Sequence, residues 1–178
     1  PAAKVTGFDP NADLLALFAE HAEEQGVAHE EVQGDWPANA DRAGPADVVV
    51  THHVVYNIPG IGEFAAALTA HARRRVVIEM SYRHPRFGVN GLWRHFWGLE
   101  RPSGPTADDA IGALIEAGIR PNVERWSRAA STVNREQRVA SIRRYLCLPS
   151  ERDPEIDALL GDGAFAWPAE VVTLWWDA

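Results

Sequence analysis

An aspartate near the start of the chain lies where a nucleotide-binding residue would be expected. The run Lys4–Phe8 favours a strand and leads into Asp9, Pro10 and Asn11, after which leucine spacing predicts a helix over residues 12–25. An Asp at the end of the second strand of a parallel sheet can accept hydrogen bonds from both hydroxyls of a ribose, about 20 residues after a Gly-rich turn. No such turn precedes Asp9, so the segment predicts half of a nucleotide pocket; by itself, Asp9 could equally be a turn or helix-capping residue.

Polar and aromatic residues also follow the later predicted strands. The segments are Gly34-Asp35-Trp36 after a run at 28–33, Thr51-His52-His53 followed by Val54–Asn57, and Glu79-Met80-Ser81. Because open α/β sheets bind ligands at the carboxyl ends of their strands, we expect these segments to lie at one edge with Asp9. Trp36 offers a flat face for stacking an aromatic base. The alternatives are a plain loop carboxylate at Asp35 and a packed loop tryptophan at Trp36.

The adjacent histidines could indicate a metal site or a general base. Neighbouring strand residues point to opposite faces, and the spacing indicates no third ligand, so we expect His52 and His53 to hold no metal. A histidine that titrates near neutral pH can deprotonate an acceptor hydroxyl or amine. We therefore expect one histidine to line the site, and the weak candidates for a catalytic role are His53 and Tyr56.

Strand and helix signals alternate along the first half of the chain. The β-branched runs 46–51 and 75–80 are typical of buried parallel strands, and a helix is predicted between them over residues 62–72. Such alternation indicates βαβ crossovers. Later elements are expected as helices at 107–117, capped by Thr106, and 134–146, and as strands at 122–127 and 170–176. The sequence predicts an α/β fold with a mostly parallel sheet and a C-terminal antiparallel strand.

Composition narrows the class of protein. The 178 residues carry a net charge of −8, and no apolar run approaches the length of a membrane span, so neither a nucleic-acid partner nor a membrane is expected. The single cysteine, Cys147, excludes an internal disulfide and is expected to be buried. A single cysteine that forms no internal disulfide is consistent with a reducing compartment, so we expect the protein to be cytoplasmic. Richness in Arg and Ala, with Lys4 the only lysine, is typical of a bacterial protein from a GC-rich genome.

Taken in order, the segments at 7–11, 34–36 and 51–57 resemble those of class I S-adenosylmethionine-dependent methyltransferases. The resemblance covers essentially all 178 residues as one domain with a Rossmann-like, doubly wound sheet. The family's first strand and glycine-rich motif are not among these residues, so the domain 1–178 is expected to be N-terminally incomplete, with that strand upstream. The resemblance implies S-adenosylmethionine as cofactor and S-adenosylhomocysteine as product.

The resemblance also implies roles for individual residues. Asp9 would hold the ribose hydroxyls, and Asp35 would accept from the adenine amino group beside Trp36. Val54–Asn57 reads Val-Val-Tyr-Asn where the family carries Glu or His, so those polar roles do not transfer. The implied cofactor-binding residues are Asp9, Pro10, Asn11, Gly34, Asp35, Trp36, Thr51 and His52.

Residues 82–105 break the regular pattern with aromatic and basic side chains. The segment predicts a lid or acceptor-binding insertion, in which Trp93 and Trp97 join His53 and Tyr56 as substrate-binding residues. Its arginines could pair with an anionic acceptor; those considered are Arg83, Arg86 and Arg94. A packed insertion or a homodimer contact is equally open.

The predicted function is methyl transfer from S-adenosylmethionine to a small-molecule acceptor by in-line displacement. Such a reaction needs positioning and exclusion of water more than covalent work by the protein. One alternative is a non-catalytic methyltransferase-like domain that binds a partner. The other is a nicotinamide-dependent oxidoreductase, which fits less well because the sole lysine leaves no Tyr-x-x-x-Lys pair.

Overall fold

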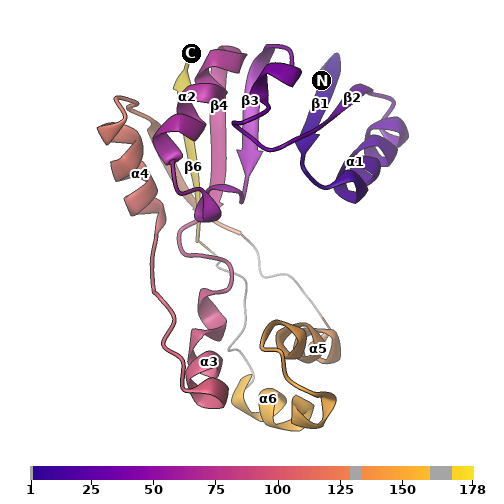
Figure 1. Cartoon of the computed structure of the whole chain (residues 1–178), viewed down its shortest axis with the longest axis vertical. Coiled ribbons are helices and arrows are strands. Elements are labelled where there is room, and N and C mark those ends of the chain that lie inside the picture. Colours follow the sequence, from indigo (N-terminus) through magenta and orange to yellow (C-terminus); the bar gives the residue numbers. More distant parts are fainter. Residues whose placement is uncertain (1, 129–133, 161–169) are drawn as a thin grey trace.

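The computed structural model describes residues 2–128, 134–160 and 170–178. Strands and helices follow one another along the chain as the sequence predicts, with two further helices (Figure 1). They are β1 (Lys4–Asp9), α1 (Ala12–Glu24), β2 (Ala28–Gln33), β3 (Ala46–His52), α2 (Ile61–His71), β4 (Ala72–Ser81), α3 (Asn90–Trp97), α4 (Ala107–Glu116), β5 (Asn122–Ser127), α5 (Arg135–Tyr145), α6 (Asp153–Leu160) and β6 (Glu170–Asp177).

The strands form two hydrogen-bonded sheets. In the smaller, β1 pairs in parallel with β2, and the larger has the order β3-β4-β6-β5. β3 and β4 are parallel, whereas β6 runs antiparallel to both β4 and β5. The α/β class, the parallel βαβ pairs and the C-terminal antiparallel strand are therefore confirmed.

The larger sheet carries the main apolar core. β4 and β6 are its two inner strands; β4 buries Val76, Ile78 and Met80, and β6 buries Val172 and Leu174. The packing against these residues comes from α2 and α4, which lie side by side on one face through Phe64, Leu68, Ala110 and Leu114. Burial of these side chains contributes about 1.5–3 kcal/mol each to folding. The core therefore fixes the ends of β3 and β4, where the candidate site lies.

β3 differs from the expected buried strand. Val48 is 48% and Val50 59% exposed, because these alternate residues share a face of β3 that the core does not cover, whereas Val49 on the other face packs against the core. β3 is also an edge of the larger sheet and, among the described residues, is paired on one side only. The β1–β2 pair lies beyond this edge (Figure 1), and no hydrogen bond described joins β1 to β3. The apolar side expected for α1 is also only partly buried, since Leu15 is enclosed but Leu14 and Leu17 face solvent.

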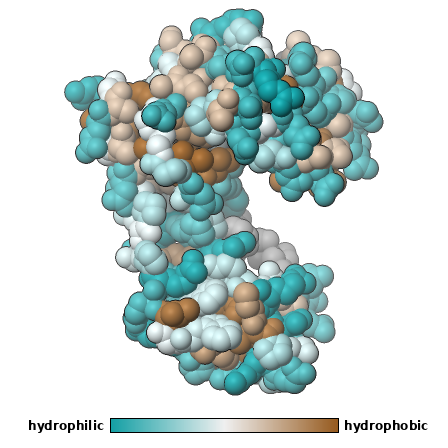
Figure 2. Space-filling view, in the orientation of Figure 1, coloured by the Kyte–Doolittle hydropathy of each residue, from teal (hydrophilic) through white to brown (hydrophobic). Residues whose placement is uncertain are grey.

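A second core lies in a helical lobe, by which we mean α3, α5 and α6 with the short turns beside them. Its buried residues come from two stretches of the chain, 89–92 and 139–160, and they are Val89, Leu92, Val139, Ile142, Leu146, Ile156 and Leu160. The predicted insertion at 82–105 thus packs against residues 134–160 rather than alone. A wide recess separates the lobe from the sheet body on one side (Figure 2).

Cys147 corrects one expectation. It follows α5 at a φ of 55° and is exposed. The helix ends at Tyr145, and the neighbouring Leu146 and Leu148 take the contacts with the lobe core. The apolar residues on either side of Cys147 are therefore no guide to the burial of the cysteine.

Candidate active site

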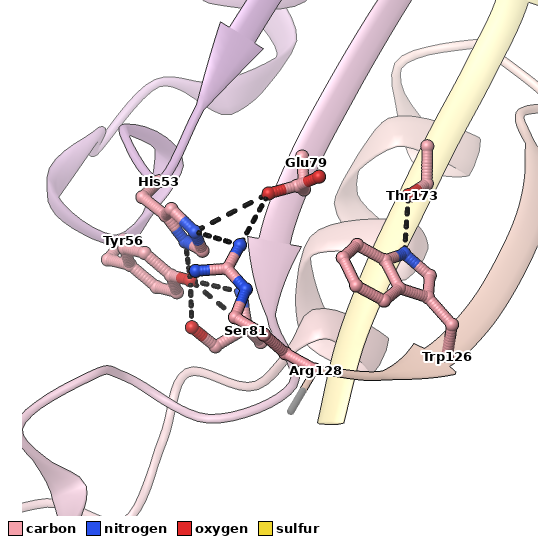
Figure 3. Close-up of polar contacts among 7 residues, drawn as sticks. All are labelled: His53, Tyr56, Glu79, Ser81, Trp126, Arg128 and Thr173. Carbon is pink, nitrogen blue, oxygen red and sulfur yellow. Dashed lines mark hydrogen bonds and ion pairs between the residues drawn. The ribbon is translucent and has the colours of Figure 1, made fainter. Parts of the chain in front are cut away.

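The carboxyl ends of β3 and β4 bring together a group of polar side chains (Figure 3). His53 follows β3 directly, and its backbone N–H donates to the carbonyl of Glu79 on β4 at 2.8 Å. Its φ of 55° lies in the left-handed region, which is uncommon for a residue with a side chain, although His adopts it more often than most. This backbone geometry carries the imidazole over the end of β4.

One side of the imidazole is held by a hydroxyl pair. Nδ1 of His53 lies 3.1 Å from the hydroxyl of Tyr56, which donates to Oγ of Ser81 at 2.9 Å. The backbone N–H of Ser81 donates back to the same phenol oxygen. Ser81 is almost completely buried, and the two rings of His53 and Tyr56 are stacked. The last residue of β4 therefore positions Tyr56, and Tyr56 positions His53.

The other side of the imidazole faces an ion pair. Arg128, just after β5, donates to the carboxylate of Glu79 at 2.9 Å and lies 3.3 Å from Nε2 of His53. Glu79 itself lies 3.6 Å from Nε2. A guanidinium only donates, so its contact requires Nε2 to be the unprotonated nitrogen and leaves the proton on Nδ1, facing Tyr56.

The surroundings set the protonation of both rings. Burial, and then the charge of Arg128, lower the pKa of His53 below its ordinary value, while Glu79 acts in the opposite direction. Burial raises the pKa of Tyr56 above that of a free phenol. At neutral pH, His53 is therefore a neutral base and Tyr56 a protonated donor.

The ends of β1 and β2 hold the predicted cofactor residues. Asp9 pairs with Gln33 in the strand register, and the N–H of Gly34 donates to the Asp9 carbonyl at 3.2 Å. Oδ1 of Asp9 accepts from the N–H of Asn11 at 2.8 Å, and the Asn11 side chain caps α1. Oδ2 of Asp9 has no hydrogen-bond partner among the described residues. The carbonyl of Pro10 accepts from the side chain of Gln33 at 3.1 Å.

Trp36 is packed between β1 and α2. Its ring meets Phe8 edge to face at a centroid distance of 5.2 Å and His71 at 4.9 Å, and its indole N–H reaches the carbonyl of Phe64 at 3.4 Å. The backbone of Asp35 is held by Asn39, while its carboxylate has no partner in the described part of the chain. These contacts fit the interpretation of Trp36 as a packed loop tryptophan. The stacking of Trp36 on an adenine stays a prediction.

Other predicted residues lie apart from these groups. Thr51 and His52 end β3, half-buried and exposed respectively, and no described contact joins them to Asp9. Trp93 lies in the helical lobe against Tyr145, at a centroid distance of 5.8 Å. Trp97 donates to the carbonyl of Leu146 at 2.9 Å at the end of α5. The structure joins His53 to Tyr56 but gives neither a direct contact with the two tryptophans.

The sequence predicted no role for Glu79, Ser81 or Arg128. The first two lie in a segment that it placed at a strand end, which was the available signal. Arg128 contacts Glu79 across 49 positions of sequence, and no local pattern marks it.

Two further features bear on the class of site. Within the described ranges, no three His, Cys, Asp or Glu side chains are arranged to hold a metal ion, and no helix is long and apolar enough to cross a membrane. A depression of about 340 Å³ lies at the opposite end of the sheet, lined by residues that include Thr69, Arg120 and Asn122. It contains none of the predicted site residues.

The topology and comparison with solved structures define the fold. The chain has the Rossmann-like fold of class I S-adenosylmethionine-dependent methyltransferases. No family model matches the sequence, and no curated protein sequence matches it.

Three solved structures illustrate this likeness. A methyltransferase candidate from Bacillus halodurans has a TM-score of 0.61 at 13% identity, over 98% of this chain and 82% of that one. A cyclopropane-fatty-acyl-phospholipid synthase-like protein from Lactobacillus casei has 0.59 at 12%, over 97% and 74%. Magnesium protoporphyrin IX methyltransferase from Synechocystis, with bound S-adenosylhomocysteine, has 0.53 at 16%, over 74% and 60%.

Proposed function

We propose that this protein binds S-adenosylmethionine and transfers its methyl group to a small-molecule acceptor by in-line displacement. The observation that carries the proposal is the position of Asp9 at the end of β1, beside the end of β2, in a methyltransferase fold. The acceptor class is supported by a neighbour named for a small molecule, magnesium protoporphyrin IX.

The carboxylate of Asp9 is suited to accept hydrogen bonds from a ribose. One carboxylate oxygen of Asp9 is used by the turn, and the other has no described partner, so it is available to accept from hydroxyls. Asp35, exposed and without a described side-chain partner, suits an amino group. When bound, S-adenosylmethionine would supply an electrophilic methyl group on its sulfonium.

His53 supplies the basic atom of the site. Its Nε2 is unprotonated at neutral pH, and the acceptor would take the place of the Arg128 guanidinium that lies 3.3 Å from it. Glu79, 3.6 Å from Nε2, would stabilise a proton gained there. Tyr56 and Ser81 fix the tautomer through Nδ1. We therefore propose that His53 takes the proton from the methyl acceptor. The residues that position the His53 ring are Tyr56, Ser81, Glu79 and Arg128.

Calorimetric titration with S-adenosylhomocysteine tests the cofactor. We expect saturable binding, and about a tenfold or greater loss of affinity in Asp9→Ala because charge-assisted hydrogen bonds to the ribose are lost. Asp9→Asn keeps an oxygen for the Asn11 N–H and controls for the turn. Asp13→Ala, an exposed acid in the first turn of α1, is the matched control and should bind as the parent does. Binding of NAD in place of S-adenosylhomocysteine would contradict the proposal.

A non-catalytic methyltransferase-like domain is the second candidate. It is favoured by one observation, that β1 and β3 share no hydrogen bonds among the described residues, which separates Asp9 from the His53 group. A further parallel strand between the two edges would join them, and we infer that the active domain includes one. Absence of S-adenosylhomocysteine binding from a polypeptide that contains such a strand would favour the binding domain.

A further inference from the structure

The segment between β4 and α4 contains basic side chains without acidic partners. Glu100 is the only acidic residue between positions 82 and 105, and it pairs with Arg94 at 2.6 Å. Arg86 and Arg101 have no carboxylate within ion-pair distance among the described residues. Arg83 on the same segment likewise has no described carboxylate partner. In a chain of net charge −8, guanidiniums left without counter-ions are available to an anion from outside.

Aromatic rings hold two of these guanidiniums in place. Arg86 lies over the ring of Tyr145 at 4.3 Å from its centroid, and Arg101 over Trp93 at 5.2 Å. The two rings meet each other edge to face at 5.8 Å. A guanidinium held over a ring face is restrained there, and its N–H donors, which lie in its own plane, can still bind an oxyanion. The two arginines are therefore preorganised through one aromatic pair.

His84 connects this group to the candidate active site. Its Nδ1 accepts from the backbone N–H of Arg86 at 3.1 Å, so the neutral ring carries its proton on Nε2, which has no described partner. Burial, then the charges of Arg86 and Arg101, lower the pKa of His84. Its ring meets that of Tyr56 at a centroid distance of 5.4 Å, and Tyr56 in turn contacts His53.

We propose that Arg86, Arg101 and the Nε2–H of His84 bind the oxyanion group, a carboxylate or phosphate, of the methyl acceptor. This inference rests on the proposed function, because it assigns the anion to the acceptor. The oxyanion would lie on the lobe side of Tyr56, and the nucleophile on the His53 side. The arrangement selects small acidic acceptors over neutral ones, because a neutral group cannot compensate the two guanidiniums.

The test titrates the full chain with inorganic phosphate and separately with benzoate, at constant ionic strength, and follows the fluorescence of the tryptophans. We expect one of the two to bind saturably; phosphate binding identifies a phosphate group, and benzoate binding a carboxylate. Arg86→Gln with Arg101→Gln should weaken this binding about tenfold or more, since hydrogen bonds to charged groups are lost. Arg94→Gln, whose guanidinium is already paired, is the matched control and should change affinity less than twofold.

Several results would overturn the inference. These are no saturable binding of either anion, equal loss in the Arg94 variant, or tighter binding of a single-stranded oligonucleotide that is lost in the same double variant. Titration with S-adenosylhomocysteine in parallel separates the two proposals. If the double variant keeps cofactor affinity and melting temperature while the parent binds no anion, this inference fails and the proposed function stands. If anions bind as expected and the cofactor does not, the anion site stands and its assignment to a methyl acceptor fails.

Discussion

At the scale of single residues, His53 lies at the centre of the candidate active site. Its ring lies between a hydroxyl relay, Tyr56 and Ser81, and an ion pair, Glu79 and Arg128. The histidine was a sequence candidate, but its tautomer and partners depend on a backbone φ of 55° and on residues from β4 and the end of β5. Neither could be predicted locally, because the strands that supply the partners are brought together only by the sheet.

Replacement of Arg128 tests the electrostatics of this histidine. Because the positive charge of Arg128 lowers the pKa of His53, Arg128→Ala should raise it, and the freed Glu79 acts in the same direction. His53 would then gain its proton at a higher pH, so the basic form would be lost over a range in which the parent keeps it. Histidine NMR titration measures this shift directly. Arg120→Ala, at the opposite end of the sheet, is the control; an unchanged or lowered pKa in Arg128→Ala would contradict the assignment.

At the scale of elements, sequence patterns located most strands and helices. The runs Ala28–Gln33 and Asn122–Ser127 have the predicted bounds, and Thr106 caps α4 with a capping box. Helices α3 and α6 were not predicted, because their apolar residues find partners only in the assembled lobe. The exposure of Val48 and Val50 on β3 was also not predicted, since a continuous apolar run does not indicate whether both faces of a strand are covered.

Two leucines on different helices test where the apolar faces are buried. Leu114 on α4 is fully buried in the sheet core, and Leu17 on α1 is 52% exposed. Leu114→Ala should lower the free energy of unfolding by about 2–5 kcal/mol, because it leaves a cavity. Leu17→Ala should change it by about 0.5 kcal/mol or less. Denaturant unfolding measures both; similar losses would show that α1 is covered in solution.

At the scale of the whole molecule, the protein has two apolar cores. The sheet body and the helical lobe share no member of their buried clusters, and the candidate site lies where the chain passes from one to the other. The lobe combines residues 87–97 with residues 135–160, which the sequence placed as separate stretches. Their association could not be predicted, because it depends on contacts between residues far apart in sequence, such as Trp93 with Tyr145 and Trp97 with Leu146.

A variant of the lobe core tests its independence. Ile156 on α6 is fully buried, so Ile156→Ala should favour local opening of the lobe by about 2–5 kcal/mol while the sheet core stays closed. Hydrogen exchange should therefore accelerate in α3, α5 and α6 but not in α2 or α4. Leu159→Ala, exposed on the same helix, should leave exchange unchanged. Uniform acceleration throughout the chain would instead indicate a single cooperative unit.

We propose above that S-adenosylmethionine binds at the carboxyl ends of the parallel strands. Hydrogen exchange with and without saturating S-adenosylhomocysteine tests it most directly. We expect the ligand to slow exchange at residues 9–14, 33–36 and 51–57, and to leave residues 118–122 at the opposite end of the sheet unaffected. Protection at 118–122 with no change at the strand ends would contradict the proposal.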